Sequence, residues 1–371
     1  MYLLKYPILG RFQIFLRFRM PLTLIGICLL VVTNTHAQYQ KYTFTRPKMG
    51  SPFVITLYAQ DTTGLYQTIE TAYAEVDKLN SIFSDYSETS EISVLTKNAK
   101  KDMPIAVSKE LMHVLKLSDT AARLSNGAFD ITVGNIVKLW RKARKDKVFP
   151  SDMDIKKALN KTGFRHITYL SDTTIAFDRV GVRLDFGGIV KGYAAQMVVD
   201  KLSKDNFKMC LVDAGGDLAI GEKPLRTFDS RNTKNMVHPD AIGTEGVGWQ
   251  IGISVPQSDN ALMPRMLTLS NCAVATSGDM YNFVAINGKR YSHIVNPKTG
   301  IGLTHQRNVT VIANDGATAD WLATACSVLP IKKAKRLIKK IRNADLLILE
   351  MQKGMIKSYQ TKGFSQYFEE H

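Results

Sequence analysis

Residues 183–195 read RLDFGGIVKGYAA, in which the short run RLDF is followed by a glycine pair and the start of a helix. The opening run predicts a buried strand, and it carries one carboxylate, Asp185. Glycines such as Gly187 and Gly188, between a strand and a helix, let a ligand approach the backbone closely, and a helix N-terminus favours an anion. Lys191 lies in the predicted helix. We therefore expect this stretch to hold the pyrophosphate and metal end of a nucleotide cofactor, with the rest of the chain building the pocket.

The N-terminus has the pattern of an export signal. The first twenty residues carry Lys5, Arg11, Arg17 and Arg19 and no acidic residue, and an apolar run follows at 22–32. A membrane anchor is the alternative. However, a membrane span needs about 20 apolar residues, and the run at 22–32 is shorter. We expect residues 1–37 to be a signal peptide cleaved after Ala37, and residues 38–371 to form a single domain.

The composition indicates a globular protein with a basic surface. The chain has 371 residues, 45% of them hydrophobic, and a formal net charge of +16. Its basic residues cluster once, at 332–342, without the aromatic interleaving or motifs typical of nucleic-acid binding. This charge suits an anionic ligand, an acidic partner or a membrane face. Cys210, Cys272 and Cys326 lie in apolar sequence and are expected to be buried core residues.

Periodicity predicts a mixture of strands, hairpins and helices, which favours an α+β fold with mixed or antiparallel sheets over a doubly wound one. Ser108 is expected to be the N-cap of one helix. Asn287 and Gly288 are expected to form the tip of a hairpin. Residues 222–248 lack periodicity and are expected to form a surface loop insertion. The expected helices span 62–83, 109–125, 317–328 and 331–341, with further helices around Trp140 and from the glycine pair to Lys204; strands are expected at 53–58, within 164–185 (three), within 208–221 (two), and at 249–255, 265–275, 308–313 and 346–350.

Several residues suit catalysis or binding, although each also has a purely structural interpretation. Asp320 and Thr324 are four residues apart and share a helix face, and both offer hard oxygen ligands for Mg²⁺; alone, they also fit an exposed acid and a core threonine. His293 follows a predicted hairpin strand and fits either a general base or a hydrogen-bonded structural histidine.

Three loops leave a similar choice open. Tyr86 is either a loop aromatic or a stacking platform for a flat ring. Asp130 follows an aromatic residue and fits a capping aspartate. The Gly215-Gly216 pair with Asp217 either admits a ligand or makes a tight turn. Neither glycine pair has the spacing of the dinucleotide fingerprint, so a Rossmann site is not expected.

In this order, the motifs resemble those of the ApbE family, the FAD:protein FMN transferases. The resemblance extends over about residues 48–349. It rests on the motifs MGSPF, FSDYSETSEISVLT, GAFDITVGNIVKLW, RLDFGGIVKGYAA, LVDAGGD, ATSGD, YSHIVNPKTG and ADWLATA.

The resemblance implies a T-fold-like architecture and a flavin transferase activity. Such enzymes bind FAD and a divalent metal, usually Mg²⁺, and split the FAD pyrophosphate. They place the FMN moiety on a Ser or Thr of a partner flavoprotein through a phosphoester and release AMP. The implied location is the periplasm or the inner-membrane face.

The resemblance also assigns roles to residues. It implies metal ligation by the Gly188 carbonyl and by the side chains of Asp320 and Thr324, and a catalytic role for His293. The implied FAD contacts are Met49, Tyr86, Ala128, Phe129, Asp130, Asp185, Lys191 and Ile294.

Two other functions remain open at this stage. An FAD pyrophosphatase would use the same metal site with water in place of the acceptor hydroxyl. A non-catalytic exported flavin-binding protein would be expected to lack a metal ligand, whereas Asp320 and Thr324 are both present. Residues 315–319, DGATA, resemble the acceptor motif that the family modifies; we expect a helix start there, with self-flavinylation as the alternative.

Overall fold

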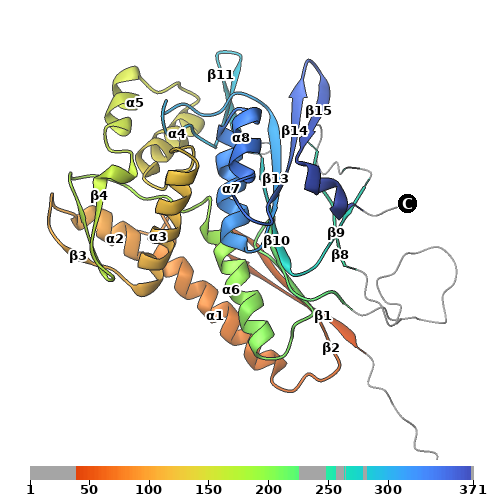
Figure 1. The fold of residues 1–371 in the computed structure, drawn as a ribbon. Coiled ribbons are helices and arrows are strands. Elements are labelled where there is room, and N and C mark those ends of the chain that lie inside the picture. The colour runs from red at the N-terminus through yellow and green to blue at the C-terminus, as the bar shows by residue number, and fades with distance from the viewer. Residues whose placement is uncertain (1–38, 225–247, 256–262, 264, 279–281, 369–371) are drawn as a thin grey trace, which may run out of the picture. The chain divides into compact units, whose positions relative to one another are not determined.

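The computed structural model describes residues 39–224, 248–255, 263, 265–278 and 282–368 (Figure 1). The described residues belong to one compact unit. The expected signal peptide and most of the expected 222–248 loop lie outside them. None of the helices in the described part combines the length and apolarity needed to cross a membrane.

An antiparallel sheet forms the centre of the fold. Within the described residues it has eight strands in the order β1-β2-β6-β7-β10-β13-β14-β15, and each neighbouring pair is antiparallel. This confirms the α+β prediction. The strands are β1 (Gln40–Lys48), β2 (Ser51–Ala59), β6 (Cys210–Asp213), β7 (Asp217–Ile220), β10 (Cys272–Gly278), β13 (Arg307–Ala313), β14 (Asp345–Gln352) and β15 (Met355–Gln360).

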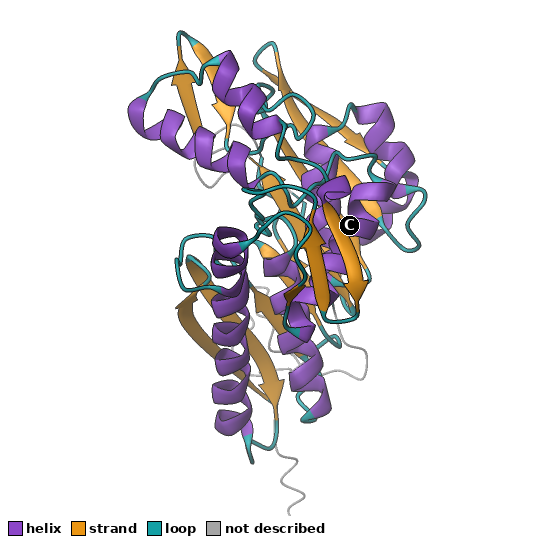
Figure 2. Ribbon diagram, turned by 90° about the vertical axis from the view of Figure 1, so that its left-hand side faces the viewer, coloured by secondary structure: helices purple, strands orange, loops and turns teal. Residues whose placement is uncertain are grey.

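Helices cover one face of this sheet. α7 (Gly316–Val328) lies on β10 and β13, and α6 (Val190–Lys204) lies on β6 and β7 beside it. α1 (Leu65–Phe83) packs against α6 and the β1–β2 hairpin (Figures 1 and 2). Every residue of β13 is buried, which fits a central strand covered on both faces.

A smaller apolar core covers the other face of the sheet. It joins β8 (Trp249–Ile251), β9 (Leu267–Leu269) and the C-terminal 3₁₀ helix (Lys362–Tyr367) to the sheet. Trp249 packs on Tyr58 with ring centroids 5.6 Å apart, and Phe364 is fully buried. Both faces of the sheet are therefore covered, one by helices and the other by this smaller core. The candidate site described below lies on the helical face.

The remaining elements extend the helical side, which faces the reader in Figure 2. Ser90, Ser108 and Ser151 each cap a helix by accepting the N–H of the residue three positions on. The elements are α2 (Glu91–Asn98), β3 (Ile105–Ala106), α3 (Lys109–Leu124), α4 (Gly134–Asp146), α5 (Asp152–Leu159), a 3₁₀ turn (Phe164–His166), β4 (Ile167–Ser171), β5 (Thr174–Phe177), β11 (Phe283–Ile286), β12 (Lys289–Ser292) and α8 (Ile331–Ile338).

The structure confirms the local signals and corrects three expectations. Asn287 and Gly288 have φ of 51° and 72°, as a two-residue hairpin turn requires. Residues 183–185 are not a strand, because they form only an isolated bridge, between Arg183 and Val133. The expected strand 265–275 is two strands, β9 and β10. The sequence analysis also did not predict α2, α5, β1, β3 and β15. All three cysteines of the described part are free thiols, two buried and Cys272 partly so.

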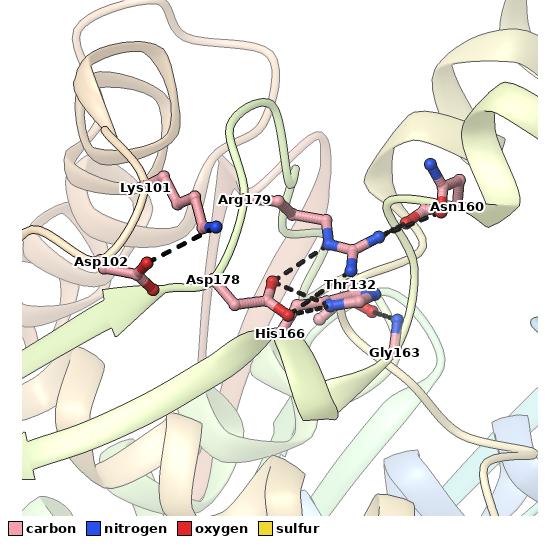
Figure 3. A network of polar contacts seen from close by, with 8 residues as sticks. All are labelled: Lys101, Asp102, Thr132, Asn160, Gly163, His166, Asp178 and Arg179. Atoms are coloured by element: carbon pink, nitrogen blue, oxygen red, sulfur yellow. Dashed lines mark hydrogen bonds and ion pairs between the residues drawn. The ribbon is translucent and has the colours of Figure 1, made fainter.

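A polar network joins the end of β5 to the turn after α5 (Figure 3). The buried His166 ring donates from Nδ1 to Asp178, 2.9 Å from Oδ1 and 3.0 Å from Oδ2. Arg179 donates to Asp178 Oδ1 at 3.1 Å and to the Asn160 carbonyl at 2.5 Å. These bonds hold the segment after β5 against the turn after α5.

Candidate functional site

Two tight turns meet at the edge of the site. Met49 and Gly50 have φ of 49° and 77° and close the β1–β2 hairpin between Lys48 and Ser51. The Ser51 hydroxyl donates to the Ala214 carbonyl at 3.4 Å. Met49, an expected FAD contact, is thereby placed beside the turn between β6 and β7.

The β6–β7 turn presents glycine backbone toward α6. Gly215 and Gly216 have φ of 80° and 101°, and both donate their N–H groups to Asp213 Oδ1, at 2.8 and 2.7 Å. A Cβ added to Gly215 would lie 3.5 Å from Lys191 Nζ. The Lys191 ammonium group therefore reaches from α6 to this turn, where an anion would meet it.

The start of α6 packs directly on α7. A Cβ added to Gly188 would lie 2.7 Å from Thr324 Oγ1, and one added to Gly192 would collide with the backbone carbonyl of Gly316. The Gly192 N–H donates to Asp320 Oδ2 at 3.1 Å. The two helices touch at glycines, and this contact brings together the three residues expected to bind metal, Gly188, Asp320 and Thr324.

Negative charge is concentrated at this helix contact. Burial and then the nearby Asp217 carboxylate raise the pKa of Asp320 well above its usual value, against smaller opposing effects of Gly192 and Lys191. Burial also raises the pKa of Asp217 to about 7; Lys191 opposes this rise and Asp213 adds to it. Two acidic side chains, Asp217 and Asp320, thus lie near the single Lys191 ammonium group.

Asp217 is the functional candidate that sequence reasoning left unassigned. It opens β7, whereas Asp320 lies in α7 more than a hundred residues later. The only local signal was its place directly after the Gly215-Gly216 pair. Its closeness to Asp320 follows from the tertiary packing of α7 against β7.

The donor set fits a divalent cation. A carboxylate, a hydroxyl and a backbone carbonyl are hard oxygen donors, and the surplus negative charge would be offset by a cation. The described residues contain no group of three or more His, Cys, Asp or Glu side chains arranged for a metal ion. A cation at the α6–α7 contact could be held by the Gly188 carbonyl, the Thr324 hydroxyl and the Asp320 carboxylate.

The expected FAD contacts 128–130 lie between residues 183–185 and α7. The Asp185 N–H donates to the Ile131 carbonyl at 2.7 Å, and the Phe129 and Trp321 rings lie 6.3 Å apart. Asp130 accepts from the Thr132 N–H and hydroxyl at 2.8 and 2.6 Å. Burial raises the pKa of Asp130, although these two bonds oppose the rise.

Asp185 belongs to a second charged group that includes Arg141. Arg141 Nη1 lies 2.5 Å from Asp85 Oδ2, and Nη2 lies 3.6 Å from Asp185 Oδ2. The guanidinium also lies over the Tyr86 ring, 4.2 Å from its centroid. The sequence analysis singled out Tyr86 and Asp185 but not Arg141, which lies inside α4.

His293 follows β12 in a hairpin that packs on α4. Trp140 of α4 lies 5.0 Å from the Tyr291 ring and donates to the Gly300 carbonyl at 2.8 Å. His293 Nδ1 lies 3.1 Å from the Asn282 carbonyl oxygen. Because a carbonyl only accepts, Nδ1 carries a proton in this contact. Ile294 follows and donates its N–H to Ser292 Oγ at 3.0 Å.

The sequence and the fold are similar to those of known flavin transferases. The ApbE family model matches residues 49–348. The chain is 27% identical over 347 residues to an FAD:protein FMN transferase of Vibrio cholerae, covering 91% of this chain and 96% of the relative. A relative of the same name from Haemophilus influenzae is 26% identical, covering 89% and 94%.

Solved structures give the same result. The flavin transferase ApbE from Vibrio cholerae superimposes with a TM-score of 0.74 at 26% identity, covering 89% of this chain and 99% of that one. The ApbE protein from Thermotoga maritima gives a TM-score of 0.75 at 26% identity, covering 89% and 100%.

Proposed function

Since this chain belongs to the ApbE family, we propose that it is an FAD:protein FMN transferase that uses Mg²⁺. In the proposed reaction, a Ser or Thr hydroxyl of a partner flavoprotein receives the FMN moiety of FAD, and AMP is released. The observation that carries the proposal is the contact between α6 and α7, where Gly188, Asp320 and Thr324 meet beside Lys191. The names of the relatives support the same activity.

The α6–α7 contact would bind the reacting pyrophosphate. Gly188, Asp320 and Thr324 would hold the cation, and Lys191 would pair with a phosphate oxygen. When bound, Mg²⁺ offsets the charge of the pyrophosphate and polarises the phosphorus under attack. In phosphoryl transfer, positioning and electrostatics account for most of the catalysis. The N-terminus of α6 adds backbone N–H groups that favour the same anion.

The remaining predicted contacts would hold the rest of FAD. The exposed Tyr86 ring offers a stacking surface, and Asp185 and Asp130 offer hydrogen-bond acceptors. Met49 on the β1–β2 turn, with Ala128, Phe129 and Ile294, would complete the contacts. These residues come from different loops, so FAD itself would link them.

His293 would handle the acceptor proton. The hydroxyl oxygen of the acceptor attacks the phosphorus on the FMN side of the pyrophosphate. The bond from that phosphorus to the bridging oxygen breaks, and AMP leaves with the electron pair. The hydroxyl proton would pass to Nε2 of a neutral His293, whose Nδ1 donates to the Asn282 carbonyl.

We also propose that the protein is exported and acts in the periplasm or at the inner-membrane face. The basic and then apolar N-terminus supports this. Sequencing the N-terminus of the protein isolated from the envelope tests it. A mature chain beginning at Gln38 is expected, and an intact Met1 in a cytosolic fraction would contradict export.

Mass spectrometry of an acceptor tests the transferase. The purified chain is incubated with FAD, Mg²⁺ and a candidate acceptor domain, and an adduct of FMN mass on Ser or Thr is expected. Omitting Mg²⁺, or using the Asp320→Ala variant, should abolish the adduct. Free FMN and AMP with no protein-bound flavin would instead show an FAD pyrophosphatase. Bound but unreacted FAD would show a flavin-binding protein.

A further inference from the structure

Arg141 joins three groups that lie far apart in the sequence. Its guanidinium lies 2.5 Å from Asp85, 3.6 Å from Asp185 and 4.2 Å from the centroid of the Tyr86 ring. Asp85 and Tyr86 lie in the loop after α1, and Asp185 lies in the stretch before α6. One side chain from α4 therefore bridges the loop after α1 and the segment that precedes the glycine pair.

The helix that carries Arg141, α4, is held in place by buried side chains. Its neighbour Trp140 is almost fully buried and donates to the Gly300 carbonyl at 2.8 Å. Ile136 and Ala143 are also buried on the same helix. The helix fixes the backbone of Arg141, and the planar fork of its guanidinium suits two carboxylates.

The bridge also compensates a repulsion. Asp185 is 13% exposed as a side chain and Asp85 is 25% exposed. Burial and the Asp85 charge raise the pKa of Asp185, while the Gly187 N–H and Arg141 lower it. Without Arg141 the two carboxylates would repel each other, and the loop that carries Tyr86 would lose its link to Asp185.

Tyr86 depends on this contact for its orientation. Its side chain is 80% exposed, so the ring has little packing of its own. The guanidinium lies over one face of the ring, which is a favourable cation–π geometry. The opposite face remains available to a flat ring.

We propose that Arg141 is a positioning residue for FAD, which holds the Tyr86 ring and the Asp185 carboxylate in the arrangement that receives a flat ring of the substrate. The inference rests on the proposed function and adds to it a residue outside the expected FAD contacts. Ordering the loop before FAD arrives lowers the cost of binding. Arg141 therefore acts through Tyr86 and Asp185, and its loss affects the binding of FAD more than the chemical step.

The first experiment measures FAD affinity and kinetics of the mature chain. Arg141→Met keeps the length of the side chain and removes its charge; Arg141→Lys keeps a charge without the planar fork. We expect Arg141→Met to raise Kd and KM for FAD about tenfold and to change kcat by less than about threefold. Arg141→Lys should recover part of the loss. Lys142→Met, an exposed neighbour on the same helix, is the matched control and should match the wild type.

A double-mutant cycle then tests whether Arg141 acts through Tyr86. FAD affinity is compared among the wild type, Arg141→Met, Tyr86→Ala and the double variant. If Arg141 orients Tyr86, Arg141→Met should lower FAD affinity by about threefold or less in the Tyr86→Ala background. An unreduced tenfold loss in the Tyr86→Ala background would overturn the inference. If thermal unfolding shows that Arg141→Met does not fold, Arg141→Lys replaces it in the same cycle.

The results separate this inference from the proposed function. A wild-type chain that does not bind FAD would contradict the proposed function itself. A wild-type chain that binds FAD, with an Arg141→Met variant of equal affinity, would contradict only the role of Arg141.

Discussion

Two polar groups of the molecule, the Asp217–Asp320 pair near Lys191 and the His166–Asp178–Arg179 network, balance their charges differently. Asp320 accepts a hydrogen bond from the Gly192 N–H, and the charged group that most affects it is a second carboxylate, Asp217. Asp178 accepts from both His166 and Arg179 (Figure 3).

The pKa shifts show the consequence of this difference. Burial raises the pKa of Asp320 and the like charge adds to the rise. Burial also works to raise the pKa of Asp178, but the hydrogen bonds of His166 and Arg179 outweigh it, and the pKa of Asp178 falls below its usual value. A carboxylate that accepts hydrogen bonds from charged protein donors, as Asp178 does, stabilises the fold. Buried acidic groups with raised pKa values, such as Asp320, are typical of functional sites.

The largest predicted effect is the loss of transfer on replacing Asp320. Asp320→Asn removes the charge that would hold the cation, so FMN transfer should fall by about a thousandfold, or about 4 kcal/mol of transition-state stabilisation. The melting temperature should stay level or rise, because a repelled buried charge is gone. Asp315→Asn is the matched control on the same helix, since asparagine also caps a helix well. Activity within twofold of the wild type for Asp320→Asn would remove Asp320 from the metal site.

The second prediction concerns the glycine contact that forms the site. In Gly192→Ala the added methyl group would meet the Gly316 backbone, which cannot move as a flexible side chain would. We expect the free energy of unfolding to fall by about 3 kcal/mol as α6 and α7 separate. Urea unfolding measures it, with Lys204→Ala at the exposed end of α6 as the control. An unchanged free energy of unfolding would show that α6 and α7 can move apart without loss of stability, which would contradict a tight contact at Gly192 and Gly316.

The third prediction concerns the His166–Asp178–Arg179 network. His166 is fully buried, so His166→Ala leaves a cavity and removes one partner of Asp178. The free energy of unfolding should fall by about 2 kcal/mol, while kcat of the folded protein changes by less than about twofold. Chemical denaturation and a transfer assay are run on the same samples. A collapse of kcat without loss of stability would give His166 a direct part in the reaction and end the contrast between the two groups.

Local sequence signals predicted the elements that carry the site better than they predicted the site itself. The glycine pair before α6, the Ser108 cap and the Asn287-Gly288 tip depend on neighbouring residues, and each lies where it was expected. Residues 183–185 were expected to end a strand but pair only at Arg183, and the chain enters α6 soon afterwards.

Contacts between distant segments could not be read from local patterns. Asp217 meets Asp320 because β7 and β10 are neighbours in the sheet and α7 packs across both. Arg141 looked like one of several basic residues after Trp140, and only the position of α4 beside Asp85 and Asp185 distinguishes it from Lys142. Family resemblance supplied the roles of Gly188 and Thr324, which local chemistry alone left open.

The smallest predicted effect is the pH dependence that Asp217 gives the metal-free protein. Its pKa is about 7 when folded, against about 4 for an unfolded aspartate. The folded state therefore binds the extra proton, so this stabilisation is present below about pH 4 and is lost as the pH rises through 7. Because the carboxylate is partly exposed to water, we expect on the order of 1 kcal/mol, roughly 2 °C in melting temperature between pH 5 and pH 8. Asp217→Asn should flatten this part of the profile, and saturating Mg²⁺ should flatten it in the wild type. An equal slope in both proteins without metal would mean that Asp217 is already balanced, and the contrast with Asp178 would then rest on Asp320 alone.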